Sequence, residues 1–225
     1  MGIILGRYRV LVVCCLALSM SCRERGCGTS ERGVEGSLGV VPGPATSSSG
    51  VPASRAGEDM LGLRLSFDGL KWLNTPDGAP VDVTGRVTLV RWWTDSCPFC
   101  AASLPAIEAL TRQYGRSGFQ AVGVYHPKPP GHVEAAEVLR SARALGYSGP
   151  VATDLDWATL KRVYLSTGNR VSTSVSFILD RDGMIRFVNP GPEFHPTDDP
   201  AKVEINRDYE DIRSAIEALL AEKPA

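Results

Sequence analysis

The pattern of apolar and polar positions separates an N-terminal part without regular periodicity from a domain that begins near residue 59. At the start of that domain, Leu61, Leu63 and Leu65 alternate with small or polar residues, which predicts a strand. The turn sequence Thr-Pro-Asp-Gly follows at 75–78. Because this turn chemistry reverses the chain, we expect an N-terminal hairpin.

Dense apolar runs predict the central strands. The sequence VTLVRWW at 87–93 and the sequence FQAVGVY at 119–125 are rich in β-branched and aromatic residues, and 150–153 predicts a third, short strand. Residues 175–188 read as two further strands joined by Asp-Arg-Asp-Gly, which indicates an antiparallel hairpin.

Four segments with helical spacing of apolar residues alternate with these strands or follow them. The predicted helices cover 101–115, 132–145, 156–164 with Asp156 as N-cap, and 208–222. Pro105 lies inside the first of them and is expected to kink it. The order β–α–β–α–β–α–β–β–α predicts a three-layer α/β domain with a central mixed sheet over residues 59–225.

The first 21 residues have the features of an export signal. Arg7 and Arg9 precede an apolar run at 10–20, which is too short to span a bilayer comfortably. The small residues before Cys22 resemble a bacterial lipoprotein signal, in which the chain is cleaved before a cysteine that is then acylated. An ordinary cleaved signal and an uncleaved anchor are the alternatives.

Residues 22–58 are dominated by Gly, Ser and Pro and have no apolar period, so we expect a flexible tether between the membrane and the domain. The 24 Lys and Arg residues are balanced by 25 Asp and Glu residues, which gives no sign of a nucleic-acid surface. Of six cysteines, four lie within the first 27 residues and two form the CxxC pair Cys97–Cys100. No second CxxC or paired His motif accompanies this pair, so we expect no metal site.

The Cys97-Pro98-Phe99-Cys100 sequence lies between a predicted strand and a predicted helix. Unpaired N–H groups at a helix N-terminus favour the thiolate, which is the attacking species in disulfide exchange. Cys100 follows one helical turn later, at a spacing that permits a disulfide. We therefore expect Cys97 to attack, Cys100 to resolve the mixed disulfide, and the pair to work without any other cofactor.

The stretch LVRWWTDSCPFCAASLPAIEAL resembles the thioredoxin superfamily, and in particular the exported TlpA-like and ResA-like thiol–disulfide oxidoreductases and the related redoxins. The proline five residues after the second cysteine matches Pro105, and a β–α insertion matches 119–153. The resemblance covers about residues 61–220. It implies a thioredoxin-like fold and a periplasmic, membrane-tethered protein. Its partners would be envelope proteins with disulfides or dithiols, together with a membrane electron donor.

Three positions depart from the family pattern. Ser174 replaces the usual cis-proline, so its preceding peptide bond is expected to be trans. Arg91 replaces a buried acid and either points toward the thiols or snorkels to the surface. Ser103 replaces a glutamate. These departures leave the redox potential and the direction of transfer open.

Other residues are expected to line the dithiol: Trp93, Thr94, Pro98, Phe99, Thr173 and Ser174. The chain after the last strand returns toward the same edge and carries Glu193 and His195. One hypothesis gives Glu193 or His195 a role in proton transfer to or from Cys100; the other makes this a loop held by prolines, with His195 capping or packing.

Two alternative functions remain open at this point. Thr94 has the spacing of a peroxiredoxin threonine relative to Cys97, which would make the chain an antioxidant thiol peroxidase. Cys97, Cys100 and His195 offer soft ligands for Cu(I), as a copper carrier would need. Related copper carriers separate their cysteines by three residues rather than two, which counts against the second alternative.

Overall fold

The computed structural model describes residues 57–166 and 170–223. The predicted signal segment at 1–21, the lipidation site Cys22 and almost all of the predicted tether lie outside these residues. Within the described part, no helix is both long and apolar enough to cross a membrane.

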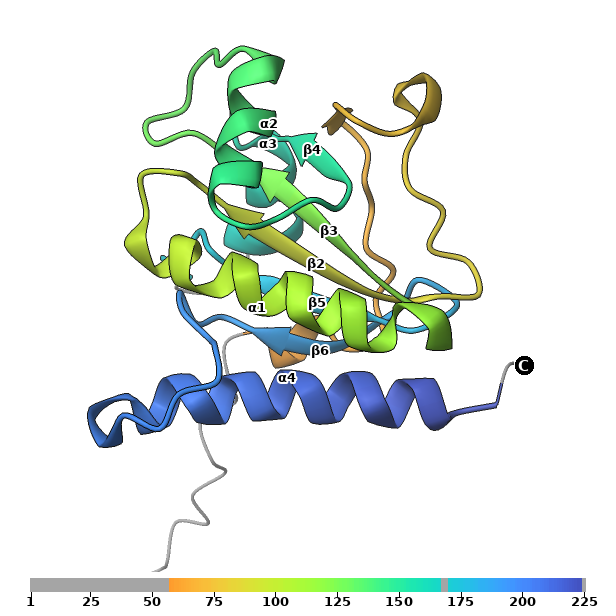
Figure 1. Cartoon of the computed structure of the whole chain (residues 1–225). Helices are drawn as coiled ribbons and strands as arrows, with labels where there is room; N and C mark the ends of the chain where they lie inside the picture. Colours follow the sequence, from red (N-terminus) through yellow and green to blue (C-terminus); the bar gives the residue numbers. More distant parts are fainter. Residues whose placement is uncertain (1–56, 167–169, 224–225) are drawn as a thin grey trace, which may run out of the picture. The chain divides into compact units, whose positions relative to one another are not determined.

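A six-stranded mixed sheet forms the centre of the domain, in the order β1-β4-β3-β2-β5-β6 (Figure 1). The strands are β1 (Lys71–Trp72), β2 (Val87–Trp93), β3 (Phe119–Tyr125), β4 (Val151–Thr153), β5 (Ser176–Leu179) and β6 (Ile185–Asn189). Strands β2, β3 and β4 are parallel, while β5, β6 and β1 pair antiparallel with their neighbours. The expected mixed sheet and its closing β5–β6 hairpin are confirmed.

The N-terminal hairpin prediction is wrong. The Leu61–Leu65 segment forms no strand, and only Arg64 makes an isolated bridge, with Met184. Leu61 and Leu63 are 47% and 56% exposed, so the alternating leucines do not bury one common face. The short β1 that follows pairs with β4 instead of with a neighbouring N-terminal strand.

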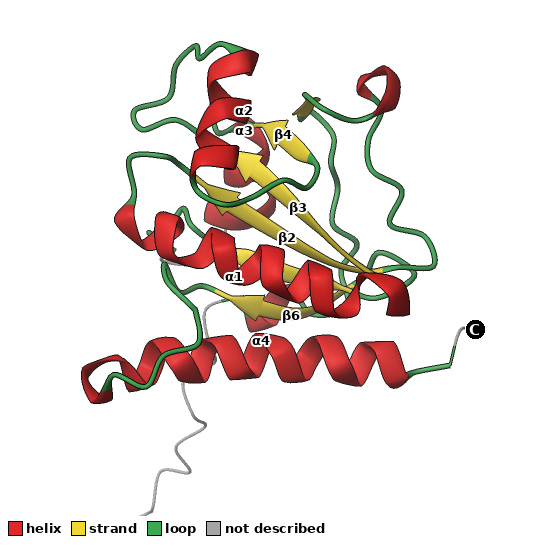
Figure 2. Cartoon of the chain, viewed as in Figure 1, coloured by secondary structure: helices red, strands yellow, loops and turns green. Residues whose placement is uncertain are grey.

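Helices cover both faces of the sheet (Figure 2). They are α1 (Pro98–Tyr114), α2 (Ala135–Ala144), α3 (Ala158–Leu160), which continues as a π-helical turn over Lys161–Leu165, and α4 (Val203–Ala221). One apolar cluster joins the sheet to α1, α2 and α4, through residues such as Leu104, Val138 and Ile212. A second cluster joins the opposite face to α3 and its π-helical turn, through Leu160 and Tyr164.

All four helices begin at residues other than those predicted, and the starts of α3 and α4 have local reasons. Helix α4 begins at Val203 because a 3-10 turn at Pro200–Lys202, capped by Asp199, leads directly into it. Asp156 accepts a hydrogen bond from the Ala158 N–H, but the buried carboxylate of Asp154 accepts from the next two N–H groups, at Thr159 and Leu160. The start of α3 is therefore capped mainly by a residue on the preceding strand end.

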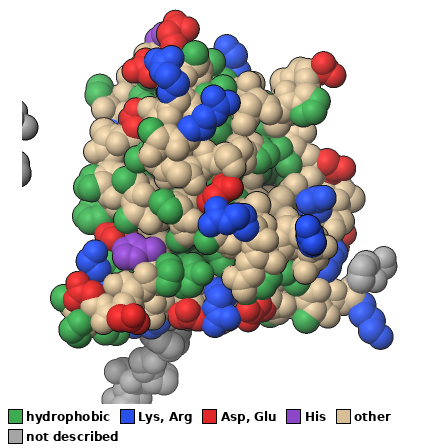
Figure 3. Space-filling view, viewed as in Figure 1, with side chains coloured by type: hydrophobic (Ala, Val, Ile, Leu, Met, Phe, Trp, Pro, Cys, Tyr) green, Lys and Arg blue, Asp and Glu red, His purple; other side chains and the backbone are tan. Residues whose placement is uncertain are grey.

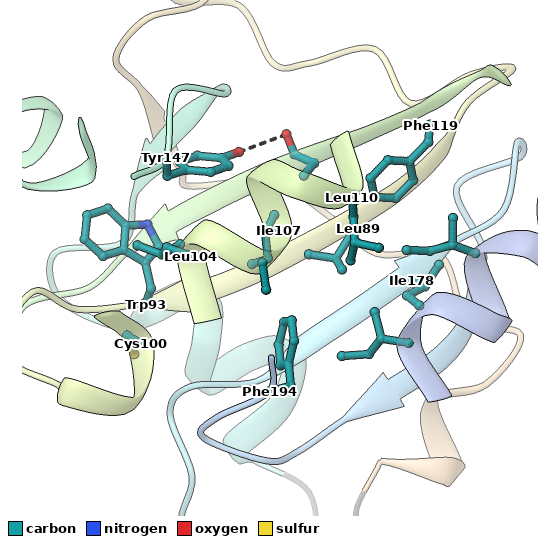
Figure 4. Packing of buried hydrophobic residues seen from close by; sticks show 14 of the residues in the cluster. Leu89, Trp93, Cys100, Leu104, Ile107, Leu110, Phe119, Tyr147, Ile178 and Phe194 are labelled. Atoms are coloured by element: carbon teal, nitrogen blue, oxygen red, sulfur yellow. Dashed lines mark hydrogen bonds between the residues drawn. The ribbon is translucent and has the colours of Figure 1, made fainter. Parts of the chain in front are cut away.

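The cluster beneath α1 reaches the cysteine pair (Figure 4). Cys100, Trp93, Leu104 and Phe194 belong to this cluster and are fully buried. The CxxC pair is therefore joined to the core on its inner side.

The outer surface is of mixed character: on the face shown in Figure 3, basic and acidic side chains are interspersed rather than gathered in one block.

Candidate active site

The two cysteines stand at the junction of β2 and α1. Cys97 is the N-cap of α1, with extended backbone angles, and its carbonyl accepts hydrogen bonds from the N–H groups of Cys100 and Ala101 at 3.1 and 3.2 Å. Pro98 occupies the first helical position, where its missing N–H removes no helical hydrogen bond. The 17-residue helix therefore begins directly at the first cysteine.

The two thiols differ in exposure. Both are free, but Cys97 is partly exposed and Cys100 is fully buried. Burial raises the pKa of Cys97, but hydrogen bonds from the Cys100 N–H, the Cys100 thiol and the Phe99 N–H, with the charge of Lys128, bring that pKa below its ordinary value. Cys97 thus combines access to solvent with a favoured thiolate, the two properties that a nucleophilic cysteine needs.

Arg91 lies under this pair and is entirely buried. Its Nη1 donates to the carbonyl oxygens of Ser174 and Gly191 at 2.8 and 3.1 Å and to Ser176 Oγ at 3.1 Å, while Nη2 donates to the Pro192 carbonyl at 2.5 Å. The guanidinium thus faces the interior of the domain, so the side chain does not extend to the surface. The surface-snorkelling alternative is wrong because four acceptors hold this side chain inside the domain.

Ser174 contacts the buried thiol itself. Its Oγ lies 3.2 Å from Cys100 Sγ, and its carbonyl accepts from Arg91. The peptide bond before Ser174 is trans, as expected, since the cis bond found among the described residues is Lys128–Pro129. Thr173, the other residue expected here, is also buried, and its hydroxyl has no hydrogen-bond partner in the described part of the chain.

Ser103 ties α1 to the segment that follows β6. Its buried hydroxyl donates to the Phe99 carbonyl at 2.8 Å and accepts from the Phe194 N–H at 3.0 Å. Phe194 in turn lies against the Arg91 guanidinium, 5.2 Å from Cζ to the ring centroid. The serine that replaces the expected glutamate is therefore a link between the helix and this segment.

The remaining predicted lining residues have different surroundings. Trp93 is buried and packs edge-on against Tyr125 at 5.0 Å, while Phe99 is 47% exposed beside the thiols. Thr94 is buried, and its hydroxyl contacts Asp95 and Ser96, with no contact to a cysteine among its recorded hydrogen bonds. The peroxidase alternative therefore gains no support from Thr94.

Glu193 and His195 pair with each other instead of with the thiols. His195 Nε2 lies 2.9 Å from Glu193 Oε1, and Nδ1 lies 3.1 Å from the Pro196 carbonyl oxygen. His195 lines a groove on the outer side of α1 with Pro105 and Ala106. No hydrogen bond recorded for the described residues joins Glu193 or His195 to a cysteine, so the geometry favours the packing interpretation.

The sequence places His126 after a strand, either as polar lining of the site or as a simple loop histidine, and the structure buries it completely. It follows β3, packs edge-on against Trp157 at 5.5 Å, and neither ring nitrogen has a hydrogen-bond partner among the described residues. Burial, assisted by the charges of Lys128 and Arg91, lowers the pKa of His126 to about 3. The imidazole is therefore neutral at physiological pH.

No group of three or more His, Cys, Asp or Glu side chains in the described ranges is arranged to hold a metal ion. Cys97, Cys100 and His195 accordingly do not come together as a three-ligand copper site. The chemistry that the site does offer is that of two sulfurs, one accessible and one buried, with a cation beneath them.

Comparisons with known proteins identify the family of the domain. The redoxin family model matches residues 73–204. Protein DipZ of Mycobacterium bovis is 30% identical over 123 residues, which cover 53% of this chain but only 17% of DipZ. The chain thus matches about a sixth of that relative's length.

Solved structures show the same fold at low identity. A protein described as a thiol:disulfide interchange protein, DsbE, from Chlorobium tepidum superposes with a TM-score of 0.53 at 23% identity, over 72% of this chain and 98% of that one. A thiol-disulfide isomerase from Corynebacterium glutamicum gives a TM-score of 0.53 at 21% identity, with the same coverage. The fold is thus thioredoxin-like, and the chain belongs to the redoxin family of thioredoxin-like oxidoreductases.

Proposed function

We propose that the chain exchanges disulfides through Cys97 and Cys100 in the bacterial cell envelope. The observation that carries this proposal is the asymmetry of the two thiols: Cys97 is accessible at the N-terminus of α1 with a lowered pKa, and Cys100 is buried one turn behind it. An accessible thiolate attacks a substrate, and a buried partner within reach then releases it.

Each reaction cycle consists of two exchanges. The Cys97 thiolate attacks one sulfur of a substrate disulfide, which breaks that bond, forms a mixed disulfide and releases the other substrate sulfur as a thiolate. Cys100 then loses its proton and attacks the Cys97 sulfur, which releases the second substrate sulfur and closes Cys97–Cys100. Two electrons pass from the protein to the substrate, and the reverse sequence passes them back.

The envelope location rests on the N-terminal sequence. Arg7, Arg9 and the apolar run before Cys22 match a lipoprotein signal, so Cys22 would carry the membrane tether. Partners would then be envelope proteins that carry disulfides or dithiols, with a membrane protein as electron donor. Replacement Cys22→Ser should move the protein from the membrane fraction to the soluble fraction of the envelope.

Trapping of the intermediate tests the exchange proposal. In Cys100→Ser, Cys97 attacks but nothing resolves the mixed disulfide, so substrate should accumulate as an adduct that reductant removes. Cys97→Ser should form no adduct, and the matched variant Cys27→Ser, outside the domain, should behave like the wild type in insulin reduction. Equal adduct formation by Cys97→Ser and Cys100→Ser would overturn the assignment of roles. Rapid peroxide consumption without insulin reduction would favour the peroxidase instead.

A further inference from the structure

A buried positive charge lies beneath the dithiol without a carboxylate to balance it. The four hydrogen-bond acceptors of Arg91 are three carbonyl oxygens and one hydroxyl, all of them neutral. None of the ion pairs within the described residues includes Arg91. A guanidinium keeps its proton in proteins, so a cation is held inside the core. Such an uncompensated charge is costly, and any nearby anion would be stabilised.

The negative charges that act on Arg91 are those of the cysteine pair. Arg91 is connected to Cys100 through Ser174, whose carbonyl binds the guanidinium and whose hydroxyl lies 3.2 Å from Cys100 Sγ. Burial lowers the pKa of Arg91, while the negative charges of Cys100 and Cys97 and a hydrogen bond with Cys100 act in the opposite sense. The thiolates are thus the charges that act on Arg91.

This arrangement distinguishes the two redox states. The dithiol can release a proton and place a thiolate beside the guanidinium, whereas the disulfide is neutral and leaves the cation unbalanced. Ser174 Oγ can donate a hydrogen bond to Cys100 Sγ, and that bond is stronger when this sulfur carries the negative charge of the pair than when it is neutral. Both contributions lower the free energy of the reduced state, and a pair whose reduced form is stabilised is a strong oxidant.

We propose that Arg91 is a buried counter-charge for the thiolate of the Cys97–Cys100 pair and that, with Ser174, it makes this chain a donor of disulfides to substrate thiols. This inference rests on the proposed function and adds its direction. Two substrate thiols give up two electrons and two protons and become a disulfide. The Cys97–Cys100 bond takes up the two electrons, and the pair binds the protons or releases one of them to solvent.

Equilibration of the full chain with glutathione tests the proposal. The redox state of the tryptic peptide that contains both cysteines is measured after alkylation, so the N-terminal cysteines do not contribute. Arg91→Gln should lower the equilibrium constant for reduction at least about tenfold, which corresponds to about 30 mV, whereas Arg91→Lys, which keeps the charge, should stay within about threefold of the wild type.

A matched pair of serines tests the second contribution. Ser174→Ala removes the hydroxyl beside Cys100 but keeps the carbonyl that holds Arg91, and should lower the same constant by roughly three- to tenfold. Ser176→Ala removes a hydroxyl that touches Arg91 but is not recorded in contact with either sulfur, and should lower it less. Equal effects of the two serine variants would contradict the role of Ser174.

A third measurement remains informative if Arg91 variants do not fold. The wild-type protein should resist urea better in its reduced form than in its oxidised form, because the same free energy that raises the potential stabilises the folded dithiol. Greater resistance to urea in the oxidised form would overturn the proposed role of Arg91 as a counter-charge. So would an equilibrium constant for reduction of Arg91→Gln that equals or exceeds the wild-type constant. An effect of Arg91→Lys as large as that of Arg91→Gln overturns it too. If no reversible couple forms at Cys97 and Cys100, the proposed function fails, and that result is distinct from the others.

Discussion

The hydroxyl of Ser103 should stabilise the domain by more than a typical surface serine does. It accepts the N–H of Phe194 at 3.0 Å inside the core, and it also donates to the Phe99 carbonyl one turn earlier in α1. Ser103→Ala leaves the Phe194 N–H buried without an acceptor, which costs about 1–3 kcal/mol of unfolding free energy. For a domain of this size, about 2 kcal/mol corresponds to a decrease in Tm of roughly 4–8 °C.

Urea unfolding of the reduced protein, followed by circular dichroism, measures this cost. Thr111→Ala is the matched control, because the Thr111 hydroxyl makes the same type of bond to the carbonyl four residues earlier but no recorded bond outside α1. We expect Thr111→Ala to change the unfolding free energy by less than about 0.5 kcal/mol. If Ser103→Ala lowers the unfolding free energy no more than Thr111→Ala does, the link between α1 and the segment after β6 does not contribute to stability.

Three further predictions concern the surroundings of the thiols. Gly123→Ala should destabilise the domain by about 1–3 kcal/mol in urea, because the added Cβ would lie 2.9 Å from the Trp93 indole nitrogen. Because the pKa of His126 is about 3 in the folded protein and about 6.5 in the unfolded chain, its contribution to stability is complete above about pH 6.5 and falls as the pH drops toward 3. The free energy of unfolding at pH 5 should therefore be about 2 kcal/mol lower than at neutral pH, and His126→Gln should abolish this difference. Lys128→Met should raise the pKa of Cys97 and slow its alkylation at pH 7, roughly twofold.

Each of these predictions has a control of the same residue type. Gly131→Ala adds a Cβ that meets nothing within 4 Å and should be nearly neutral. His132→Gln changes an exposed histidine that makes no contact with His126 in the recorded ring contacts, and should keep the loss of stability at pH 5 that is assigned to His126. Lys71→Met removes an exposed charge that does not act on Cys97 and should not change its alkylation. Equal effects in a variant and its control would refute the reasoning for that site.

The placement of the cysteines could be predicted from the sequence because it depends on local signals. An apolar β-branched run, a proline at the first helical position and helical spacing after it set β2, Cys97 and α1 within one continuous segment. The β5–β6 hairpin was also predictable, since an Asp-Arg-Asp-Gly turn joins two apolar runs. Neither inference required knowledge of distant contacts.

The failed and open predictions all depended on distant contacts. The leucines at 61–65 alternate as a strand would, but the segment meets the start of β6 only through backbone hydrogen bonds to residues 183–185 and the single Arg64–Met184 bridge, and it forms no strand. The inward direction of Arg91 depends on carbonyls about 80 to 100 residues later in the chain. Glu193 was expected near the thiols, yet it pairs with His195 because the intervening Phe194 points into the core.

Redox titration of the full chain against glutathione tests whether Cys97 and Cys100 exchange disulfides as a pair. The tryptic peptide 92–112 contains Cys97 and Cys100 and none of the other cysteines, so its alkylation state reports this pair alone. We predict one reversible two-electron transition, closer to about -120 mV than to about -270 mV. The absence of a reversible transition at this peptide would contradict disulfide exchange by the Cys97–Cys100 pair.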